Sequence, residues 1–352
     1  MCRWLILIIL FRIGIESGRN GAGHGCHSAT LPRQDIGTDK GRSRMVAVFL
    51  DAAMDDDARR RHLYRGDLFM YTPRPATMAL VEHAREMIEN AFGGRDPRMV
   101  QYQMSVEDFV AICAPFKPAF IHHPRTKELV QAMLVDLGCD AEQTYFDVPR
   151  LRSMTSDDYL KAGVGYQFHP HRDTWFSAPL AQLNWWMPIY EITPESSMAF
   201  HPRYFDEGVK NSSGEYNYYE WNQTGRAEAA KQIKTETRKQ PKAEEEVELD
   251  PQIRLIPPPG GVMVFSGAQF HSTVPNTSGA TRYSIDLRTV YRRDLEEKVA
   301  APNADSAPQG TTLRDFLRVT DLTRLPEDLV LQYDNVEEHT GVLIYDPAQQ
   351  QT

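Results

Sequence analysis

The stretch FHPHRDTW, residues 168 to 175, contains three side chains of the types that bind metal ions. His169, His171 and Asp173 occupy alternate positions, and alternate residues of an extended strand point to the same face of a sheet. An imidazole near a carboxylate is also common as an ordinary hydrogen-bonded pair inside a fold. The stretch alone therefore permits metal binding without establishing it.

One further histidine, His271, follows an apolar run much later in the chain. Two imidazoles and one carboxylate on one face of a metal form the facial triad of non-haem Fe(II) oxygenases, which leaves the other coordination positions open for a cosubstrate and O₂. His171, Asp173 and His271 supply that set of ligands. We therefore predict that these three residues hold Fe(II) and form the catalytic centre.

An iron-based oxidant needs electrons, and a 2-oxo acid supplies them by decarboxylation if a cation holds its distal carboxylate. Arg282, eleven residues after His271, is suited to this role because a guanidinium has a permanent charge and forked donors. Arg288 lies six residues further on and, by parity, on the same strand face. It is the competing candidate for the same role.

The pattern of these residues resembles the phytanoyl-CoA dioxygenase family of Fe(II)/2-oxoglutarate-dependent oxygenases. The resemblance covers roughly residues 140 to 292 and rests on the H-x-D of His171 to Asp173, on the G-x-x-x-F-x-G-x-x-x-H approach to His271, and on Arg282. The turn PESSMAFHPRYF departs from the Gly-containing turn of many members, but it contains none of the predicted ligands.

The resemblance implies a double-stranded β-helix, the jelly roll of cupin-like proteins, with Fe(II) at its open end and 2-oxoglutarate as cosubstrate. It implies that Arg282 anchors the C5 carboxylate of 2-oxoglutarate and that the Thr273 hydroxyl bonds the same carboxylate. Trp186 or Trp185 would line the cosubstrate pocket. Further pocket-lining candidates are Gln167, Asn184 and His201.

The implied reaction is hydroxylation, or another oxidation, of an aliphatic C–H bond of a small organic molecule, with succinate and CO₂ released. Asp173 disfavours halogenation, because halogenating relatives carry a small residue in place of this carboxylate. One alternative is a non-catalytic jelly-roll binding or sensor protein that uses His169, His171 and His271 around Zn²⁺, or no metal. Another is a cupin-type metalloenzyme that uses O₂ without 2-oxoglutarate.

The elements that must position these residues change in character along the chain. Residues 75 to 92 have amphipathic helical spacing, Ser105 begins a short second helix and Thr126 caps a third. From about residue 143, short β-rich runs are separated by Pro- and Gly-bearing turns, with no βαβ alternation. We predict a mainly β fold with flanking helices (α+β), mostly antiparallel, as a sandwich or barrel.

Three regions are expected along the chain. Residues 1–44 are a disordered leader or a start-site artefact, residues 45–292 are the oxygenase domain, and residues 293–352 are a C-terminal extension. Residues 206–250 are too long for a hairpin loop and form an insertion. Its charged second half is expected to face water, and its aromatic first half is a candidate lid or a packing element: Tyr216, Tyr218, Tyr219 and Trp221.

Composition restricts the partners and the compartment. The formal net charge is −9, with 48 acidic and 39 basic residues, so no global field would attract nucleic acid or an anionic membrane. The four cysteines show no C-x-x-C spacing, which favours a reduced, cytoplasmic setting. The apolar run near the N-terminus is similar to that of a signal peptide, which keeps secretion as an alternative, but Arg12 interrupts the run and no A-x-A cleavage pattern follows it. The run is also too short to span a bilayer. We expect a small-molecule substrate and no nucleic-acid or membrane partner.

Overall fold

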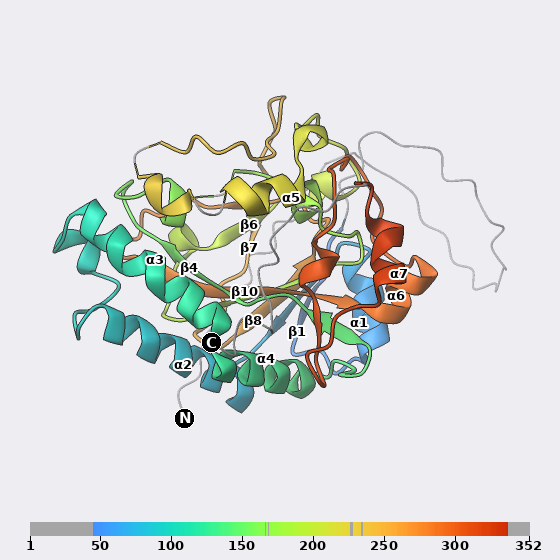
Figure 1. Cartoon of the computed structure of the whole chain (residues 1–352), viewed down its shortest axis with the longest axis horizontal. Helices are drawn as coiled ribbons and strands as arrows, with labels where there is room; N and C mark the ends of the chain where they lie inside the picture. The colour runs from blue at the N-terminus through green and yellow to red at the C-terminus, as the bar shows by residue number, and fades with distance from the viewer. Residues whose placement is uncertain (1–44, 166, 168, 226–227, 234, 337–352) are drawn as a thin grey trace, which may run out of the picture. The chain divides into compact units, whose positions relative to one another are not determined.

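The computed structural model describes residues 45–336 except 166, 168, 226–227 and 234 (Figure 1). The predicted leader, residues 1–44, lies outside the described residues, as does the last part of the predicted C-terminal extension.

A large sheet forms the centre of the described part of the chain. Its strands are β1 (Val48–Leu50), β2 (Leu68–Tyr71), β3 (Thr144–Phe146), β4 (Arg150–Met154), β5 (Leu183–Pro188), β8 (Val262–Ser266), β10 (Arg282–Tyr291) and β11 (Leu317–Arg318). The strand order is β1-β2-β8-β5-β10-β3-β11, and β4 also pairs with β10. Apart from the parallel pair β1 and β2, these pairings are antiparallel, as the sequence predicted.

A smaller sheet contains β6 (Met198–Phe200), β7 (Ile253–Arg254) and β9 (His271–Thr273), in the order β7-β6-β9. An isolated antiparallel bridge between His171 and His271 extends this sheet on the far side of β9. The chain therefore alternates between the sheets, from β4 to the bridge at His171, back to β5, across to β6 and β7, back to β8, across to β9 and back to β10. This path is that of a double-stranded β-helix, and the predicted fold class is confirmed.

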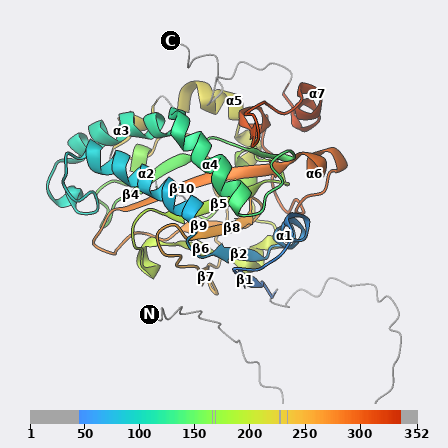
Figure 2. The ribbon, with the colours of Figure 1, turned by 90° about the horizontal axis from the view of Figure 1, so that it is seen from below.

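Helices cover the outer face of the large sheet (Figures 1 and 2). The three long ones are α2 (Pro75–Ala91), α3 (Val106–His122) and α4 (Pro124–Asp136). Their buried residues form one hydrophobic core with the outward-facing side chains of β5 and β10, such as Trp185 and Ile285. The shorter helices are α1 (Asp56–Leu63), α5 (Tyr218–Glu220), α6 (Arg292–Glu297) and α7 (Glu327–Val330).

The helix predicted over residues 75 to 92 is confirmed as α2, and Gly93 stops it with a positive φ of 62°. Ser105 caps α3 as predicted, by accepting from the backbone N–H of Asp108, but this helix is not short, since it continues through Pro115 and Pro118 to His122.

The prediction that Thr126 caps the next helix is wrong. Helix α4 begins at Pro124, and His123 is the N-cap. Proline is favoured at the first helical position because its φ is already helical and its missing N–H would have had no partner there. Thr126 instead lies in the first turn, where its hydroxyl is 3.0 Å from Nε2 of His83.

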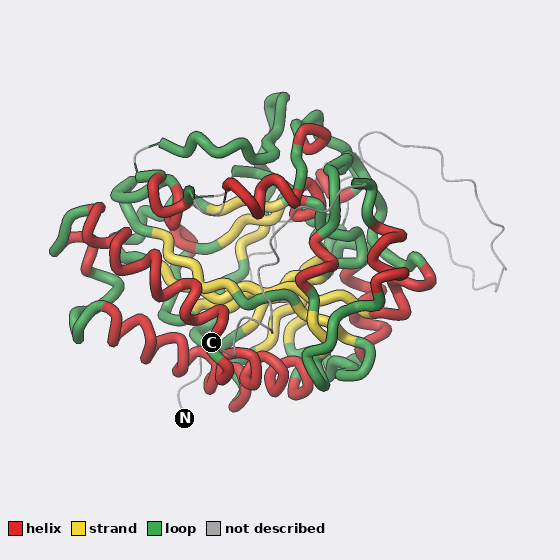
Figure 3. The backbone as a smooth tube through the Cα atoms, in the orientation of Figure 1, coloured by secondary structure: helices red, strands yellow, loops and turns green. Residues whose placement is uncertain are grey.

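Most of the insertion, residues 206–250, is loop (Figure 3). Its aromatic half contains α5 and the short turns Ser213–Glu215 and Trp221–Gly225. The charged half, residues 227–250, contains one short 3₁₀ turn, Ala229–Lys231, and its described residues are mostly exposed or half-buried, as the mixed charges predict. Within the described part of the chain, no helix combines the length and apolar character needed to cross a bilayer.

Candidate metal centre

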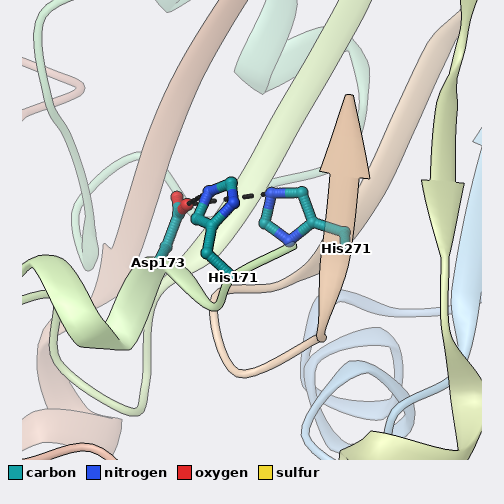
Figure 4. Close-up of side chains that lie close together, drawn as sticks. All are labelled: His171, Asp173 and His271. Atoms are coloured by element: carbon teal, nitrogen blue, oxygen red, sulfur yellow. Dashed lines mark ion pairs between the residues drawn. The ribbon is translucent and has the colours of Figure 1, made fainter. Parts of the chain in front are cut away.

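His171, Asp173 and His271 converge between the two sheets, and each offers a ligand atom within 4.8 Å of the others (Figure 4). Nε2 of His171 lies 3.5 Å from Oδ1 of Asp173, and Nε2 of His271 lies 3.9 Å from the same oxygen. Both histidines are buried and Asp173 is partly buried. The structure thus brings together the three residues predicted as a triad, and their role as metal ligands stays a prediction.

The backbone holds the two histidines in register. The N–H of each donates to the carbonyl oxygen of the other at 2.9 Å, and on its other side His271 pairs with Phe200 of β6. The antiparallel ladder therefore fixes the separation of the two rings, whose centroids lie 4.4 Å apart.

The sequence predicted that the H-x-D segment is an extended strand with alternating side-chain directions. This prediction is wrong beyond Arg172. Arg172 is extended, with φ −112° and ψ 146°, but Asp173 begins a 3₁₀ turn, Asp173–Phe176. The turn brings the Asp173 carboxylate toward both histidines. The His169 side chain is exposed, so it does not share a buried face with the triad as the alternation predicted.

The two imidazoles of the triad are oriented in the same way. Nδ1 of His171 lies 2.6 Å from the carbonyl oxygen of His169, and Nδ1 of His271 lies 2.9 Å from that of Gln269. A carbonyl can only accept, so each Nδ1 carries the proton and donates, and each Nε2 keeps its lone pair toward Asp173. This tautomer, held by a backbone carbonyl, is the arrangement in which histidine binds a metal through Nε2.

Electrostatics favour the protonation states that a cation requires. Burial, together with the neighbouring His171, lowers the pKa of His271 to about 4, so its ring is neutral at pH 7. Burial acts to raise the pKa of Asp173, but the contacts with His171 and His271 and the charge of Arg150 outweigh it and hold that pKa below its usual value. A neutral imidazole and an ionised carboxylate are ready to coordinate without first losing protons.

The second carboxylate oxygen of Asp173 faces side chains from the large sheet. Oδ2 accepts from Nε2 of Gln182 at 3.2 Å and lies 3.5 Å from Nε of Arg288. Arg288 is also 3.4 Å from both Asp147 and Asp286. Arg288 is therefore engaged by three carboxylates, which favours Arg282 over Arg288 as the residue free to bind an external anion, and this role stays a prediction. Sequence reasoning missed Gln182; only its place just before the Trp-bearing strand could have suggested it.

Unlike Arg288, Arg282 has no carboxylate within ion-pair distance among the described residues. It is 8% exposed and donates through Nη1 to the carbonyl oxygen of Ser196 at 2.9 Å. Its Nε is buried without a hydrogen-bond partner, and so is Oγ of Ser284, two residues along the same face of β10. Burial lowers the pKa of Arg282 to about 10, so the group stays charged at pH 7. A buried cation beside an unpaired hydroxyl is costly unless an anion binds there.

Trp186, and not Trp185, lies beside Arg282. The Arg282 guanidinium is 5.3 Å from the ring centre of Trp186, and Trp186 belongs to the cluster of apolar side chains between the sheets. Trp185 points to the helices and donates through Nε1 to the Thr289 hydroxyl at 2.9 Å. Of the two tryptophans that the sequence left open, Trp186 is the one on the same side of the sheet as Arg282, and its role toward a cosubstrate stays a prediction.

Thr273 lies on β9 of the smaller sheet, and Arg282 reaches toward the same sheet from β10 of the large one. On β9, Thr273 is two residues past His271, on the same face, and pairs with Met198. His271 pairs with Phe200, whereas Arg282 is bonded at Ser196, so Arg282 lies on the order of 10 Å further along. A five-carbon dicarboxylate with contacts at both ends spans such a distance.

The remaining pocket-lining candidates fall in different places. Asn184 is buried beside the triad and accepts from Gln182 at 2.9 Å. Gln167 is half-buried before His171, and its side chain makes no hydrogen bond to a described residue. Both ring nitrogens of His201 are hydrogen bonded, to the Leu249 carbonyl and the Ser272 hydroxyl at 2.8 and 2.9 Å, so they are already engaged within the protein.

The aromatic half of the insertion reaches the triad through Phe176. The Phe176 ring lies 5.4 Å from that of His171 and 5.4 Å from that of Tyr216, which in turn lies 6.1 Å from Trp221. The hydroxyl of Tyr218 is hydrogen bonded to Asp315, in the predicted C-terminal extension. The insertion and the extension are therefore joined on the Phe176 side of the triad.

Neither a protein-family model nor a curated protein sequence matches the chain. Among solved structures, the chain is similar to EvdO2 from Micromonospora carbonacea var. aurantiaca, with 14% identity and a TM-score of 0.40 over 69% of this chain and 93% of that one. It is also similar to the non-haem alpha-ketoglutarate-dependent carbocyclase SnoK from nogalamycin biosynthesis, with 13% identity and a TM-score of 0.39 over 72% and 93% of the two chains. A third is AviO1 from Streptomyces viridochromogenes Tue57, with 16% identity and a TM-score of 0.34 over 71% and 99%. Likenesses this distant leave the activity of the chain to be judged from its own residues.

Proposed function

We propose that the protein is a non-haem Fe(II)- and 2-oxoglutarate-dependent oxygenase that oxidises an aliphatic C–H bond of a small organic molecule. One observation carries the proposal: a His-Asp-His triad shares one interior with a buried arginine that has no carboxylate partner among the described residues. The triad suits a divalent metal, and the arginine suits the distal carboxylate of a dicarboxylic cosubstrate.

His171, Asp173 and His271 would hold Fe(II), which when bound supplies the redox chemistry that activates O₂. Gln182 and Arg288 hold Oδ2 of Asp173, so that only Oδ1 faces the two imidazoles. The carboxylate would then bind through one oxygen. Three protein ligands on one side leave the other positions open for the cosubstrate and O₂.

Arg282 would receive the distal carboxylate of 2-oxoglutarate, and the hydroxyls of Ser284 and Thr273 would donate to it. The apolar carbons of the cosubstrate would lie against Trp186. In the overall reaction 2-oxoglutarate loses CO₂ and is oxidised to succinate, which takes one oxygen atom of O₂. In a hydroxylation the other oxygen atom enters the substrate. The carboxylate of Asp173 supports this outcome over halogenation, which needs that position for a halide.

The substrate is proposed to be a small molecule that enters on the side of Phe176 and is covered by the aromatic half of the insertion. The support is the row of rings from His171 through Phe176 and Tyr216 to Trp221. The cytoplasmic location remains a prediction from cysteine usage.

The direct test is to measure succinate formed from 2-oxoglutarate by the purified protein with Fe(II) and O₂, alone and with candidate substrates. Arg282→Ala is expected to weaken 2-oxoglutarate binding strongly, and therefore to lower succinate release when 2-oxoglutarate is limiting. Arg85→Ala is the matched control, because the Arg85 guanidinium also donates to one backbone carbonyl, that of Ile189, and also lies over an aromatic ring, that of Tyr190. A binding or sensor protein would instead keep its ligand affinity in Arg282→Ala. Protein that binds Fe(II) yet never decarboxylates 2-oxoglutarate with any candidate substrate contradicts the proposal.

A further inference from the structure

The segment that carries two of the three proposed ligands is fastened to residues 305–312 of the C-terminal extension. The Thr174 hydroxyl is 2.7 Å from that of Ser306. The Ser177 hydroxyl donates to the carbonyl oxygen of Gln309 at 2.7 Å, and the N–H of Thr312 donates to the carbonyl oxygen of Ser177 at 3.1 Å. Residues that follow Asp173 are therefore held by a part of the chain that contributes no ligand.

Asp305 is the centre of these contacts. Its carboxylate accepts from Nε of Arg172 at 2.9 and 3.0 Å, from Nε1 of Trp175 at 2.7 Å and from the N–H of Val209 at 2.8 Å. The Asp305 side chain is only 6% exposed. Arg172 and Trp175 lie on either side of Asp173 in the sequence, so one carboxylate fixes the chain before and after the ligand.

Arg172 is the middle residue of the H-x-D segment and is 1% exposed. Besides Asp305, its guanidinium donates to the carbonyl oxygens of Ala268 at 2.7 Å and of Glu207 at 2.8 Å. Arg172 is thus hydrogen bonded to three distant parts of the chain: the turn before His271, the start of the insertion and the C-terminal extension. Without Asp305 this buried guanidinium would lose its only ion-pair partner among the described residues, and a buried cation left in this way moves toward water or disturbs its surroundings.

We propose that Asp305 is a positioning residue of the metal centre, which fixes His171 and Asp173 in metal-binding geometry through Arg172 and Trp175. The inference rests on the proposed function, because it assigns a role toward the metal that His171, Asp173 and His271 would bind. Asp305 does not touch the metal position. Removing it should therefore weaken and reshape the site rather than delete a ligand.

The test uses Co(II), which replaces Fe(II) and reports its coordination through visible absorption. In the full-length protein, Asp305→Asn and Asp305→Ala are expected to bind Co(II) about tenfold more weakly, with a changed visible spectrum and the larger effect in Asp305→Ala. The matched control is Asp294→Asn. Asp294 is another buried carboxylate that accepts from an arginine Nε and an aromatic side chain, Arg60 and Tyr64, at 2.7 and 2.8 Å. Its loss should lower the melting temperature and leave the affinity and spectrum of Co(II) unchanged.

The outcomes separate this inference from the proposed function. Wild-type protein that binds neither Co(II) nor Fe(II) overturns the proposed function itself. Wild-type protein that binds Co(II), together with folded Asp305 variants of unchanged affinity and spectrum, overturns only the positioning role. If the Asp305 variants do not fold, Trp175→Phe decides, because it removes the indole N–H that donates to Asp305 and keeps an aromatic ring. Its expected loss of Co(II) affinity is about threefold, and an unchanged affinity would overturn the positioning role.

Discussion

His171 and His271 are hydrogen bonded to each other through their backbones in both directions, with N···O distances of 2.9 Å. This is a hydrogen-bonded pair of an antiparallel ladder, in which two opposite residues exchange both of their backbone N–H···O bonds. It holds the two imidazoles side by side without help from a metal, and so preorganises two of the three proposed ligands. The carboxylate of Asp173 comes from a 3₁₀ turn outside this ladder and depends on other contacts.

Arg282 should control the affinity for 2-oxoglutarate. The loss of charged hydrogen bonds in Arg282→Ala is expected to cost about 2 to 3 kcal/mol, which corresponds to a KM for 2-oxoglutarate raised roughly 30- to 150-fold. Arg282→Lys should be intermediate, because lysine keeps the charge and loses the planar fork. Steady-state kinetics of succinate release measures both variants. An unchanged KM for 2-oxoglutarate in Arg282→Ala would show that Arg282 does not bind the cosubstrate.

Ser284→Ala should raise the KM for 2-oxoglutarate by roughly five- to tenfold, because one hydrogen bond is worth about 1 kcal/mol. Ser153→Ala is the control. Ser153 is also a buried hydroxyl, but it pairs with Tyr283 and faces Cys113 on the helical side of the sheet. Equal effects of the two substitutions on the KM would show that Ser284 has no specific contact with the cosubstrate.

Arg288→Ala should destabilise the metal-free protein by about 3 kcal/mol, since it removes a cation shared by three carboxylates. Asp147 and Asp286 keep Arg150 and Arg152, whereas Asp173 loses the only arginine within ion-pair distance among the described residues. Urea unfolding followed by circular dichroism measures the change. Arg61→Ala is the comparison, because Arg61 forms an exposed pair with Asp57, and water and salt screen such pairs so that they add little to stability. A loss as small as that of Arg61→Ala would mean that Arg288 is not holding a buried charge cluster.

The metal-free protein should lose stability through His271 as the pH falls. Folding lowers the pKa of His271 from 6.5 to about 4, so between these values the unfolded chain binds a proton that the folded protein does not. The free energy of unfolding therefore falls as the solution is acidified through this window, by up to about 1.4 kcal/mol per pH unit. Urea unfolding at several pH values should give a shallower dependence for His271→Gln than for the wild type. Identical slopes would show that His271 is already protonated in the folded protein.

Residue types and their spacing were enough to predict that His171, Asp173 and His271 lie close together. The triad and Arg282 depend on side-chain chemistry that few other positions could supply, and the alternating run RYSIDLRTVY coincides with β10, Arg282–Tyr291. The mainly β fold followed from the same short runs. In these cases the local pattern and the tertiary structure agree.

The contacts that hold the triad could not be predicted, because they depend on how distant segments meet. The sequence could not show that Gln182 and Arg288 face Oδ2 of Asp173, or that Asp305 meets Arg172. The sequence predicted an extended strand at Asp173, but the chain forms a 3₁₀ turn there, Asp173–Phe176. This turn directs the carboxylate of Asp173 toward both histidines. Local alternation carries no information about such a turn.

The pairing of His171 with His271 also limits when the metal centre can form during synthesis of the chain on the ribosome. A ribosome adds about 5 to 20 residues per second, so His271 emerges roughly 5 to 20 seconds after His171, and Asp305 follows later. During translation, the H-x-D segment is therefore exposed from the ribosome before His271 can pair with it and before Asp305 can bind Arg172. Iron loading is accordingly expected late, after most of the chain has been synthesised, and a nascent chain stalled before residue 271 should not retain iron.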